Sequence, residues 1–290
     1  MLRFDREVLL ITGGAGGIGS AAAQYFLERG TRVAIADTDA TKLEQVRRDL
    51  RAYGDRLFGI EETVAHPDGA NRIVHAAVSK FRTLSVLINN AAIVRDNLAL
   101  RMPAEQFDEV IATNLSGAFY CAKAAVPHMI RGGGGRVINM ISASAIAGNP
   151  GQSNYAAAKG GLLAMTLTWS KEWAKYGITV NAVIPAAWTG MSEQIPERVL
   201  LGVFGEDKVR EMRSRKPSQV APLLGYLVSP AARDVTGQCL SIAGCRLSVW
   251  GYGKPVLEME SRDERWDEEE IAERIEAMGP PWQHPGPSVL

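Results

Sequence analysis

The sequence predicts an α/β protein with a doubly wound parallel sheet, organised as a single domain with a C-terminal extension. Three observations support this class. Short apolar runs alternate with helix-length segments, a glycine-rich turn follows the first run, and polar residues stand where several runs end. Apolar strands separated by helices require right-handed crossovers and a sheet covered on both faces. The ligand cleft is then expected at the carboxyl ends of the strands.

The expected elements follow one another in order from residue 8. Strands are expected over 8–11, 33–36, 57–60, 84–88, 137–141, 179–183 and 238–242. Helices are expected over 20–29, 40–52, 68–81, 103–130, 154–176 and 217–228. We therefore assign residues 1–250 to one dinucleotide-binding and catalytic domain. Within it, residues 186–216 lack a strand pattern and are interpreted as a substrate lid.

The first apolar run, Val8–Ile11, leads into Thr12-Gly-Gly-Ala-Gly-Gly-Ile-Gly19 and then into a helix-like segment. Glycines let backbone N–H groups approach a pyrophosphate, and the start of the helix supplies a partial positive charge. The next run ends at Asp37, whose carboxylate can bind both ribose hydroxyls and would repel a 2′-phosphate. Neither the glycine turn nor the residues directly after Asp37 include Arg or Lys, so NAD is expected rather than NADP.

Tyr155 and Lys159 stand one helical turn apart, and Ser142 follows the apolar run that ends at Ile141. Residues i and i+4 share a helix face, so the lysine ammonium is expected to lower the pKa of the phenol. A tyrosine with a lowered pKa can exchange a proton with an alcohol near neutral pH. Ser142 would polarise the oxygen of the substrate.

The glycine turn, Asp37, Asn89-Asn-Ala-Ala92, Asn114, Ser142 and Tyr155-x-x-x-Lys159 occur in one order. Over roughly residues 4–245 the chain resembles the short-chain dehydrogenase/reductase family of classical type. The resemblance implies a Rossmann-like fold and an NAD(P)-dependent oxidoreductase that acts on CH–OH groups. It also implies that Tyr155 is the acid/base, that Lys159 lowers its pKa and binds the ribose, and that Ser142 contacts the substrate oxygen. Asn114 would complete the tetrad from mid-helix by holding a water that links the lysine to solvent.

The same resemblance implies the contacts of the cofactor. These contacts come from the glycine turn, the ends of strands, the Tyr155–Lys159 helix and the segment that begins at Pro185. The residues are Gly13, Gly17, Ile18, Gly19, Asp37, Thr63, Val64, Asn90, Ala91, Ala92, Tyr155, Lys159, Pro185, Trp188 and Thr189.

Several residues depart from the family pattern around the cofactor. Thr63 stands where an Asp usually meets the adenine amino group. The absence of that aspartate would cost about 1.5–3 kcal/mol of cofactor binding unless Glu61 or Glu62 compensates. Ala92 and Ala186 replace usual glycines, and Arg82 and Ser85 replace a usual Gly and Asp.

The composition is that of an ordinary soluble enzyme, with 290 residues, 46% hydrophobic content and 32 basic against 32 acidic residues. A balanced charge predicts no nucleic-acid or membrane partner. No signal-peptide core or run of eighteen apolar residues is present, so a cytoplasmic protein is expected. The three Cys and four His residues lack metal-ligand spacing, so no metal is expected. The resemblance implies a homo-oligomer, either a tetramer or a dimer.

The expected reaction is hydride transfer between NAD and a secondary alcohol (hydroxyacyl-CoA, alicyclic or steroid-like) or its ketone. Apolar residues in the lid favour a hydrophobic or ring-bearing substrate. Its basic residues suit the phosphates of a CoA thioester or, alternatively, form the solvated face of a plain amphipathic helix pair: Arg210, Arg213, Arg215 and Lys216.

Two further functions remain open. Residues 149–155 also resemble a 3-oxoacyl carrier-protein reductase, although Asp37 weighs against the NADP that such an enzyme usually takes. A non-catalytic NAD-binding regulatory protein is the other alternative.

Residues 251–290 form the expected extension, which is charged and Pro-rich. Asp267 and Glu270 fit a capping box, Trp266 and Ile271 fit a hydrophobic staple, and Gly279-Pro280 fits a stop. One short helix is therefore expected there.

Overall fold

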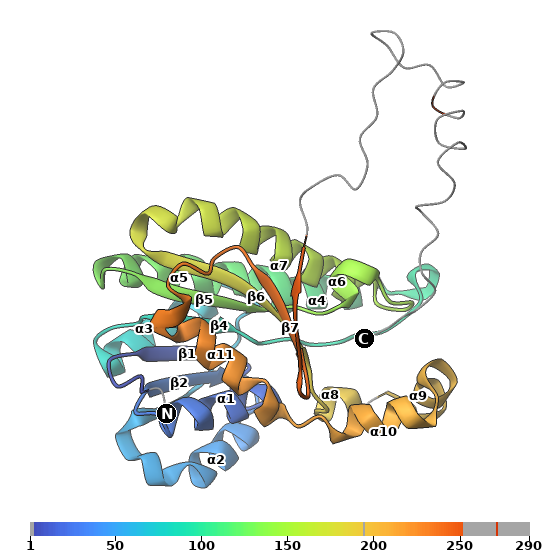
Figure 1. Ribbon diagram of the computed structural model, residues 1–290, viewed down its shortest axis with the longest axis horizontal. Helices are drawn as coiled ribbons and strands as arrows, with labels where there is room; N and C mark the ends of the chain where they lie inside the picture. Colours follow the sequence, from blue (N-terminus) through green and yellow to red (C-terminus); the bar gives the residue numbers. More distant parts are fainter. Residues whose placement is uncertain (1–2, 194, 252–270, 272–290) are drawn as a thin grey trace. The chain divides into compact units, whose positions relative to one another are not determined.

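The computed structural model describes residues 3–193, 195–251 and 271. Its sheet has eight strands in the order β3-β2-β1-β4-β5-β6-β7-β8 (Figure 1). The strands are β1 (Val8–Thr12), β2 (Arg32–Asp37), β3 (Leu57–Glu61), β4 (Val86–Asn89), β5 (Gly135–Met140), β6 (Ile178–Ala186), β7 (Cys239–Ala243) and β8 (Arg246–Trp250). The first seven are parallel and β8 runs antiparallel to β7. The chain thus winds outward from β1 to β3 and then in the other direction from β4.

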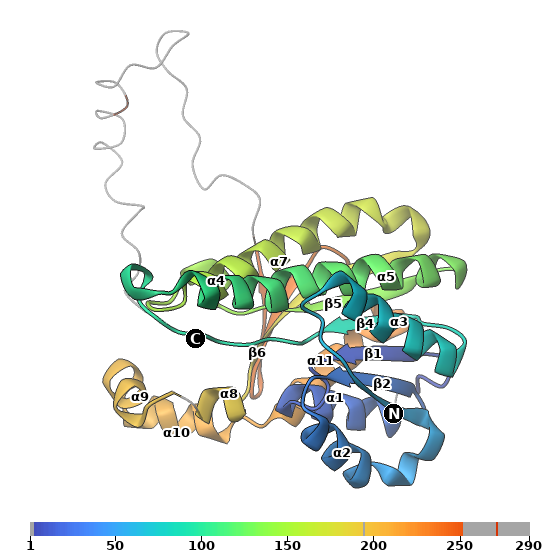
Figure 2. The same ribbon diagram turned by 180° about the vertical axis from the view of Figure 1, so that it is seen from behind.

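Helices cover both faces of this sheet (Figures 1 and 2). One face carries α1 (Gly17–Leu27), α2 (Ala40–Asp49) and α11 (Ala221–Val228), which pack side chains such as Phe26 into one core cluster. The other carries α3 (Pro67–Phe81), α5 (Gly117–Arg131) and α7 (Ser153–Glu172), which pack side chains such as Ile73 and Trp169 into a second cluster. The predicted doubly wound α/β fold is therefore confirmed.

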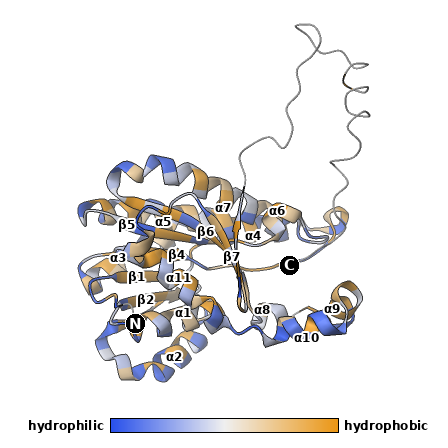
Figure 3. Cartoon of the chain, in the orientation of Figure 1, coloured by the Kyte–Doolittle hydropathy of each residue, from blue (hydrophilic) through white to orange (hydrophobic). Residues whose placement is uncertain are grey.

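The central strands are apolar because both of their faces are covered. All five residues of β1 are buried, and the sheet is mostly orange in the hydropathy view (Figure 3). A strand buried on both faces is a continuous apolar run, without alternating polar and apolar residues. This is why the sequence predicted these strands.

Several expected boundaries differ from the structure. The helix expected over 103–130 is α4 (Ala104–Ile111), a π-helical turn (Ala112–Ser116) and α5. The strand expected from residue 84 begins at Val86, because the Ser85 hydroxyl accepts the hydrogen bond of the Val8 N–H at 3.0 Å. The helix expected over 154–176 ends at Glu172. The helix expected from 217 begins at Ala221, after the 3-10 turn Pro217–Gln219.

One region contains a strand that the sequence did not predict, and another contains helices that the sequence offered only as an alternative, the amphipathic helix pair. Strand β8 was missed because Leu247 and Val249 are exposed, so the strand has no buried apolar run. Residues 186–216 fold largely into α8 (Gly190–Glu193), α9 (Glu197–Phe204) and α10 (Glu206–Ser214). In both views these helices lie toward the same edge of the sheet as α4 and the short α6 (Ser144–Ala147) (Figures 1 and 2). The capping box and stop expected after residue 251 lie outside the described residues.

Candidate active site

The glycine turn leaves room for a ligand at the start of α1. Gly13 has φ +61°, and a Cβ there would lie 2.7 Å from the Ala91 Cα. No side chain of the described residues caps α1, whose N-cap is Gly16 and whose first turn has no acidic residue. Uncapped N–H groups at a helix start suit a pyrophosphate, so Gly17, Ile18 and Gly19 fit the predicted cofactor.

Thr12 and Asn90 fasten the glycine turn to the end of β4. The Thr12 hydroxyl accepts hydrogen bonds from the Asn90 and Ala91 backbone N–H groups, both at 3.1 Å. The Asn90 side-chain amide donates to the Thr12 carbonyl at 3.0 Å and to the Gly13 carbonyl at 2.9 Å. Thr12 was not among the predicted site residues, although a polar residue that ends a buried strand was a signal for it.

Asp37 lies beside the glycine turn at the end of β2. Its carboxylate accepts from the Ala15 N–H at 3.1 Å and from the Asp39 N–H at 3.2 Å. An ionised carboxylate offers about four acceptor positions, so Asp37 keeps capacity for ribose hydroxyls.

The adenine side of the site is built from Thr63 and its neighbours. The Thr63 hydroxyl accepts from the Ala65 N–H at 3.1 Å. Glu62, the suggested substitute acid, already accepts from the Thr63 N–H at 2.9 Å and from the Arg72 guanidinium at 2.6 Å. The guanidinium lowers the pKa of Glu62, so this carboxylate is ionised but engaged. Val64 is buried against Gly117, where a Cβ would lie 2.7 Å from its methyl group.

Lys159 lies at the centre of the predicted tetrad. Its side chain is 2% exposed, and its Nζ donates to the Met140 carbonyl at 2.8 Å and lies 5.6 Å from the centre of the Tyr155 ring. Met140 ends β5, two residues before Ser142, so Lys159 joins α7 to the strand end that carries the serine. The Ser142 hydroxyl accepts from the Ser144 N–H at 3.3 Å and hydrogen-bonds the Ser144 hydroxyl at 3.1 Å.

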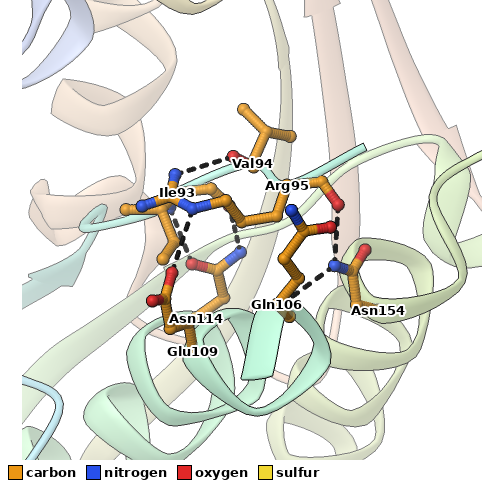
Figure 4. Close-up of polar contacts among 7 residues, drawn as sticks. All are labelled: Ile93, Val94, Arg95, Gln106, Glu109, Asn114 and Asn154. Carbon is orange, nitrogen blue, oxygen red and sulfur yellow. Dashed lines mark hydrogen bonds and ion pairs between the residues drawn. The ribbon is translucent and has the colours of Figure 1, made fainter. Parts of the chain in front are cut away.

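Asn114 contributes to this site through its side chain. It lies in the π-helical turn, a kind of turn that is frequent at functional sites. Its Oδ1 accepts from the Ile93 N–H at 2.8 Å and its Nδ2 donates to the Ile93 carbonyl at 2.9 Å (Figure 4). Asn114 therefore fastens the segment that follows β4. The resemblance implied a different role for Asn114, that of holding a water, and did not include this contact.

The expected direction of the Tyr155 pKa is wrong in this structure. Burial raises the pKa of Tyr155 to about 12, and the negative charge of Asp96 acts in the same direction. Burial also lowers the pKa of Lys159 to about 8. Desolvation disfavours both charged forms, and the Lys159 ammonium donates to a backbone carbonyl instead of the phenol. The helical spacing placed the two residues together but did not determine the balance of these effects.

The segment after β6 approaches the glycine turn from the lid side. A Cβ at Gly17 would lie 3.4 Å from the Thr189 methyl group and 3.5 Å from Pro217. The Trp188 N–H donates to the Arg215 carbonyl at 2.7 Å, which ties this segment to the end of α10. The structure therefore places Thr189, from the predicted segment, against the glycine turn.

The arginines of the lid are engaged in ion pairs with their neighbours. Arg210 pairs with Asp207 at 3.2 Å, and Arg213 pairs with Glu197. Arg215 is 7% exposed and donates to Glu211 at 2.8 Å. This is the arrangement of an amphipathic helix pair, and it leaves these three arginines less available for the phosphates of a CoA thioester.

Two cavities of about 380 Å³ are formed by described residues. The first lies beside the start of α7 and is lined by Ala99, Met102, Ala104, Phe107, Asp108 and Ser153. Because Ser153 is two residues from Tyr155, this largely apolar cavity adjoins the predicted catalytic helix. The second lies near the amino ends of the strands, with Arg6, Glu7 and Arg136 in its lining, and is remote from the predicted tetrad.

Within the described ranges, no three His, Cys, Asp or Glu side chains are grouped to bind a metal ion. No helix in the described part of the chain is long and apolar enough to cross a lipid bilayer.

Comparison with known proteins agrees with this fold. Residues 7–199 match the family described as short chain dehydrogenase. A 3-oxoacyl acyl-carrier-protein reductase (FabG) of Thermotoga maritima is 37% identical over 252 residues, which cover 84% of this chain and 98% of that protein. The same enzyme of Staphylococcus epidermidis is 36% identical over 245 residues, covering 81% of this chain and 96% of its own.

Solved structures show the same relationship. A short chain dehydrogenase from Mycobacterium avium superposes with a TM-score of 0.80 at 32% identity, covering 94% of both chains. A levodione reductase superposes with a TM-score of 0.76 at 27% identity, covering 83% of this chain and 98% of its own.

The chain belongs to the short-chain dehydrogenase family. It is an oxidoreductase that acts on CH–OH groups and uses a nicotinamide cofactor.

Proposed function

We propose that the protein reduces 3-oxoacyl thioesters to 3-hydroxyacyl thioesters, with an acyl carrier protein as the carrier. The observation that carries this proposal is its 36–37% identity to enzymes of that name over 81–84% of this chain. This similarity favours the carrier-protein alternative over the hydroxyacyl-CoA, alicyclic or steroid-like alcohols that the sequence placed first.

The site residues have distinct roles in this reaction. The nicotinamide supplies the hydride when it is bound. Tyr155 gives a proton to the substrate oxygen, and the Ser142 hydroxyl donates a hydrogen bond to the same oxygen. A phenol with a pKa near 12 is protonated at neutral pH, as a proton donor must be. Lys159, buried beside the Tyr155 ring, provides the cation that favours the resulting phenolate.

The cofactor that we propose is NAD(H). Asp37 supports this proposal, because its carboxylate lies against the glycine turn at Ala15 and would repel a 2′-phosphate. The expected result is a higher kcat/KM with NADH than with NADPH for the same substrate. A preference for NADPH would refute this assignment without affecting the proposed substrate.

The apolar cavity beside α7 supports an acyl substrate. Met102 and Phe107 line this open hollow near the start of the catalytic helix, and an acyl chain attached to the reacting carbonyl can lie against them. We further propose a homo-oligomer, either a tetramer or a dimer, which sedimentation of the purified protein would test.

The deciding experiment compares substrates and variants. Oxidation of NADH is followed with a 3-oxoacyl thioester of acyl carrier protein, the same thioester of CoA, alicyclic ketones and a ketosteroid. The carrier-protein thioester is expected to give the highest kcat/KM. Tyr155→Phe is expected to lose about 10²–10⁴-fold in kcat, because it lacks the exchangeable proton.

Tyr176→Phe serves as the control, since Tyr176 is 38% exposed on the 3-10 turn after α7 and should retain activity. Full activity of Tyr155→Phe would refute the role of Tyr155. NADH binding without turnover of any substrate would favour the non-catalytic regulatory alternative.

A further inference from the structure

The segment that follows β4 is fastened by two asparagines from different helices. Asn114, in the π-helical turn, binds both backbone groups of Ile93. Asn154, in the first turn of α7, donates from its Nδ2 to the Arg95 carbonyl at 3.0 Å and to the Gln106 carbonyl at 3.2 Å. Both side chains point toward residues 93–95 (Figure 4). Asn154 has no exposed surface, so these bonds are made away from water.

The other end of the Asn154 side chain contacts the catalytic tyrosine itself. Its Oδ1 accepts from the Tyr155 N–H at 2.7 Å. One side chain therefore joins the segment after β4, helix α4 and the backbone of Tyr155. A buried amide with both of its ends hydrogen-bonded fixes the groups that it joins, because each bond is costly to leave unmade.

The Asn97 N–H also donates to the Gly151 carbonyl at 2.8 Å, ahead of α7, and the other side-chain contacts of residues 95 and 96 are more exposed. Arg95 pairs with Glu109 at 2.9 Å, and both side chains are about half exposed. The Gln152 amide donates to the Asp96 carboxylate at 3.0 Å, also at the surface. Exposed pairs of this kind contribute little to rigidity. The buried bonds of Asn154 are therefore the strongest side-chain link between these residues and α7.

We propose that Asn154 is a positioning residue that sets the place of Tyr155 relative to residues 93–97. This inference rests on the proposed role of Tyr155 as the proton donor. Tyr155 acts only if its phenol meets the substrate oxygen at hydrogen-bond distance, and a misplacement of about 1 Å can cost about 100-fold in rate. Asn154 does not touch the substrate in this proposal and acts through Tyr155.

The test separates the two ends of the Asn154 side chain. Asn154→Ala removes all three hydrogen bonds. Asn154→Asp keeps an acceptor for the Tyr155 N–H but loses both donors to Arg95 and Gln106. If the link between α7 and residues 93–97 matters, both variants lose at least tenfold in kcat. Activity is normalised to NADH-binding sites, so that any unfolded fraction is not counted.

Asn97→Ala is the matched control. Asn97 lies in the same segment, but its side-chain amide donates only to the Arg101 carbonyl at 3.1 Å, and its backbone bond to Gly151 does not depend on the side chain. Its kcat is expected within twofold of the wild type. A kcat within twofold of the wild type in Asn154→Asp would overturn the positioning role, because the bonds to Arg95 and Gln106 would then be dispensable.

Hydrogen exchange provides a readout that does not depend on turnover. The backbone amides of residues 93–97 and the start of α7 are expected to exchange faster in both Asn154 variants and not in Asn97→Ala. Unchanged exchange in the Asn154 variants would overturn the inference. If the wild type turns over none of the substrates, the proposed function fails, and exchange still decides whether Asn154 fastens the segment.

Discussion

Tyr155 and Lys159 share one face of α7, yet burial moves their pKa values apart, to about 12 and about 8. At the scale of single residues, desolvation dominates both shifts. The sequence showed which residues meet, because a spacing of four places side chains on one helix face. It did not show how much water each side chain loses, because that depends on segments remote in the chain.

A substitution at Asp96 tests this electrostatic account of Tyr155. Burial is the larger cause of the raised pKa, and Asp96 is the second. Asp96→Asn removes the negative charge but keeps an acceptor for the Gln152 amide. The Tyr155 pKa is expected to fall, while burial still holds it above that of a free tyrosine.

The measurement is the pH dependence of kcat/KM for oxidation of the 3-hydroxyacyl thioester, which requires the phenolate. In Asp96→Asn the rise in activity toward alkaline pH should occur at a lower pH than in the wild type. Glu109→Gln, which removes a different carboxylate near the same loop, should leave the profile in place. A shift in the opposite direction would contradict the account.

At the scale of elements, glycines allow α7 to approach its neighbours. A Cβ at Gly161 would lie 3.0 Å from the Leu115 side chain, and one at Gly160 would lie 3.7 Å from the Ala145 carbonyl. The π-helical turn that carries Asn114 and the short helix after Ser142 therefore both pack against α7. The order of the predicted elements came from the sequence, whereas this close contact depends on packing between them.

Helix α10 in the lid contains a charge cluster with a testable pH dependence. The Glu211 carboxylate accepts from Arg215 at 2.8 Å and from Lys208 at 3.0 Å, which lowers its pKa to about 2. A carboxylate with a lowered pKa stabilises the folded lid above its ordinary value of 4.5, and this contribution is lost as pH falls toward about 2. Glu211→Gln is expected to loosen the lid at neutral pH by leaving Arg215 unpaired.

Hydrogen exchange of residues 206–214 measures this effect. The wild type should be better protected than Glu211→Gln at pH 7, and the difference should disappear as pH falls below 4.5 toward 2. Asp207→Asn is the control in the same helix, because Asp207 and its partner Arg210 are both largely exposed. Equal protection of the wild type and Glu211→Gln at pH 7 would count against the role of the cluster.

At the scale of the whole molecule, a buried line of polar side chains links the sheet to the helical layer. The Asn89 amide donates to the Asn139 carbonyl oxygen at 2.9 Å, and the Asn139 amide donates to the Thr166 hydroxyl at 2.9 Å. The hydroxyl in turn donates to the Leu162 carbonyl at 2.9 Å. This line joins β4, β5 and α7, the elements that carry or adjoin the predicted catalytic residues.

Breaking the line should lower the stability of the fold. Thr166→Val keeps the shape of the side chain but leaves the Asn139 amide without its partner, which costs about 1–3 kcal/mol. Thr168→Val, two residues further along α7, removes an exposed hydroxyl bonded to the Ala164 carbonyl and should change stability by less than about 0.5 kcal/mol. Urea unfolding of both variants measures the difference. Equal urea midpoints for the two variants would show that the hydrogen bond between Asn139 and Thr166 does not contribute to stability.

The sequence by itself determined the class of the fold and the order of its elements, because strands buried on both faces leave continuous apolar runs. It also identified the residues at the strand ends, such as Asp37, Asn90 and Ser142, which a parallel sheet brings to one edge. The tertiary structure alone decided the pKa directions of Tyr155 and Lys159 and the contacts of Thr12 and Asn154. These properties arise from desolvation and from hydrogen bonds between distant segments, and neither leaves a periodic pattern in the chain.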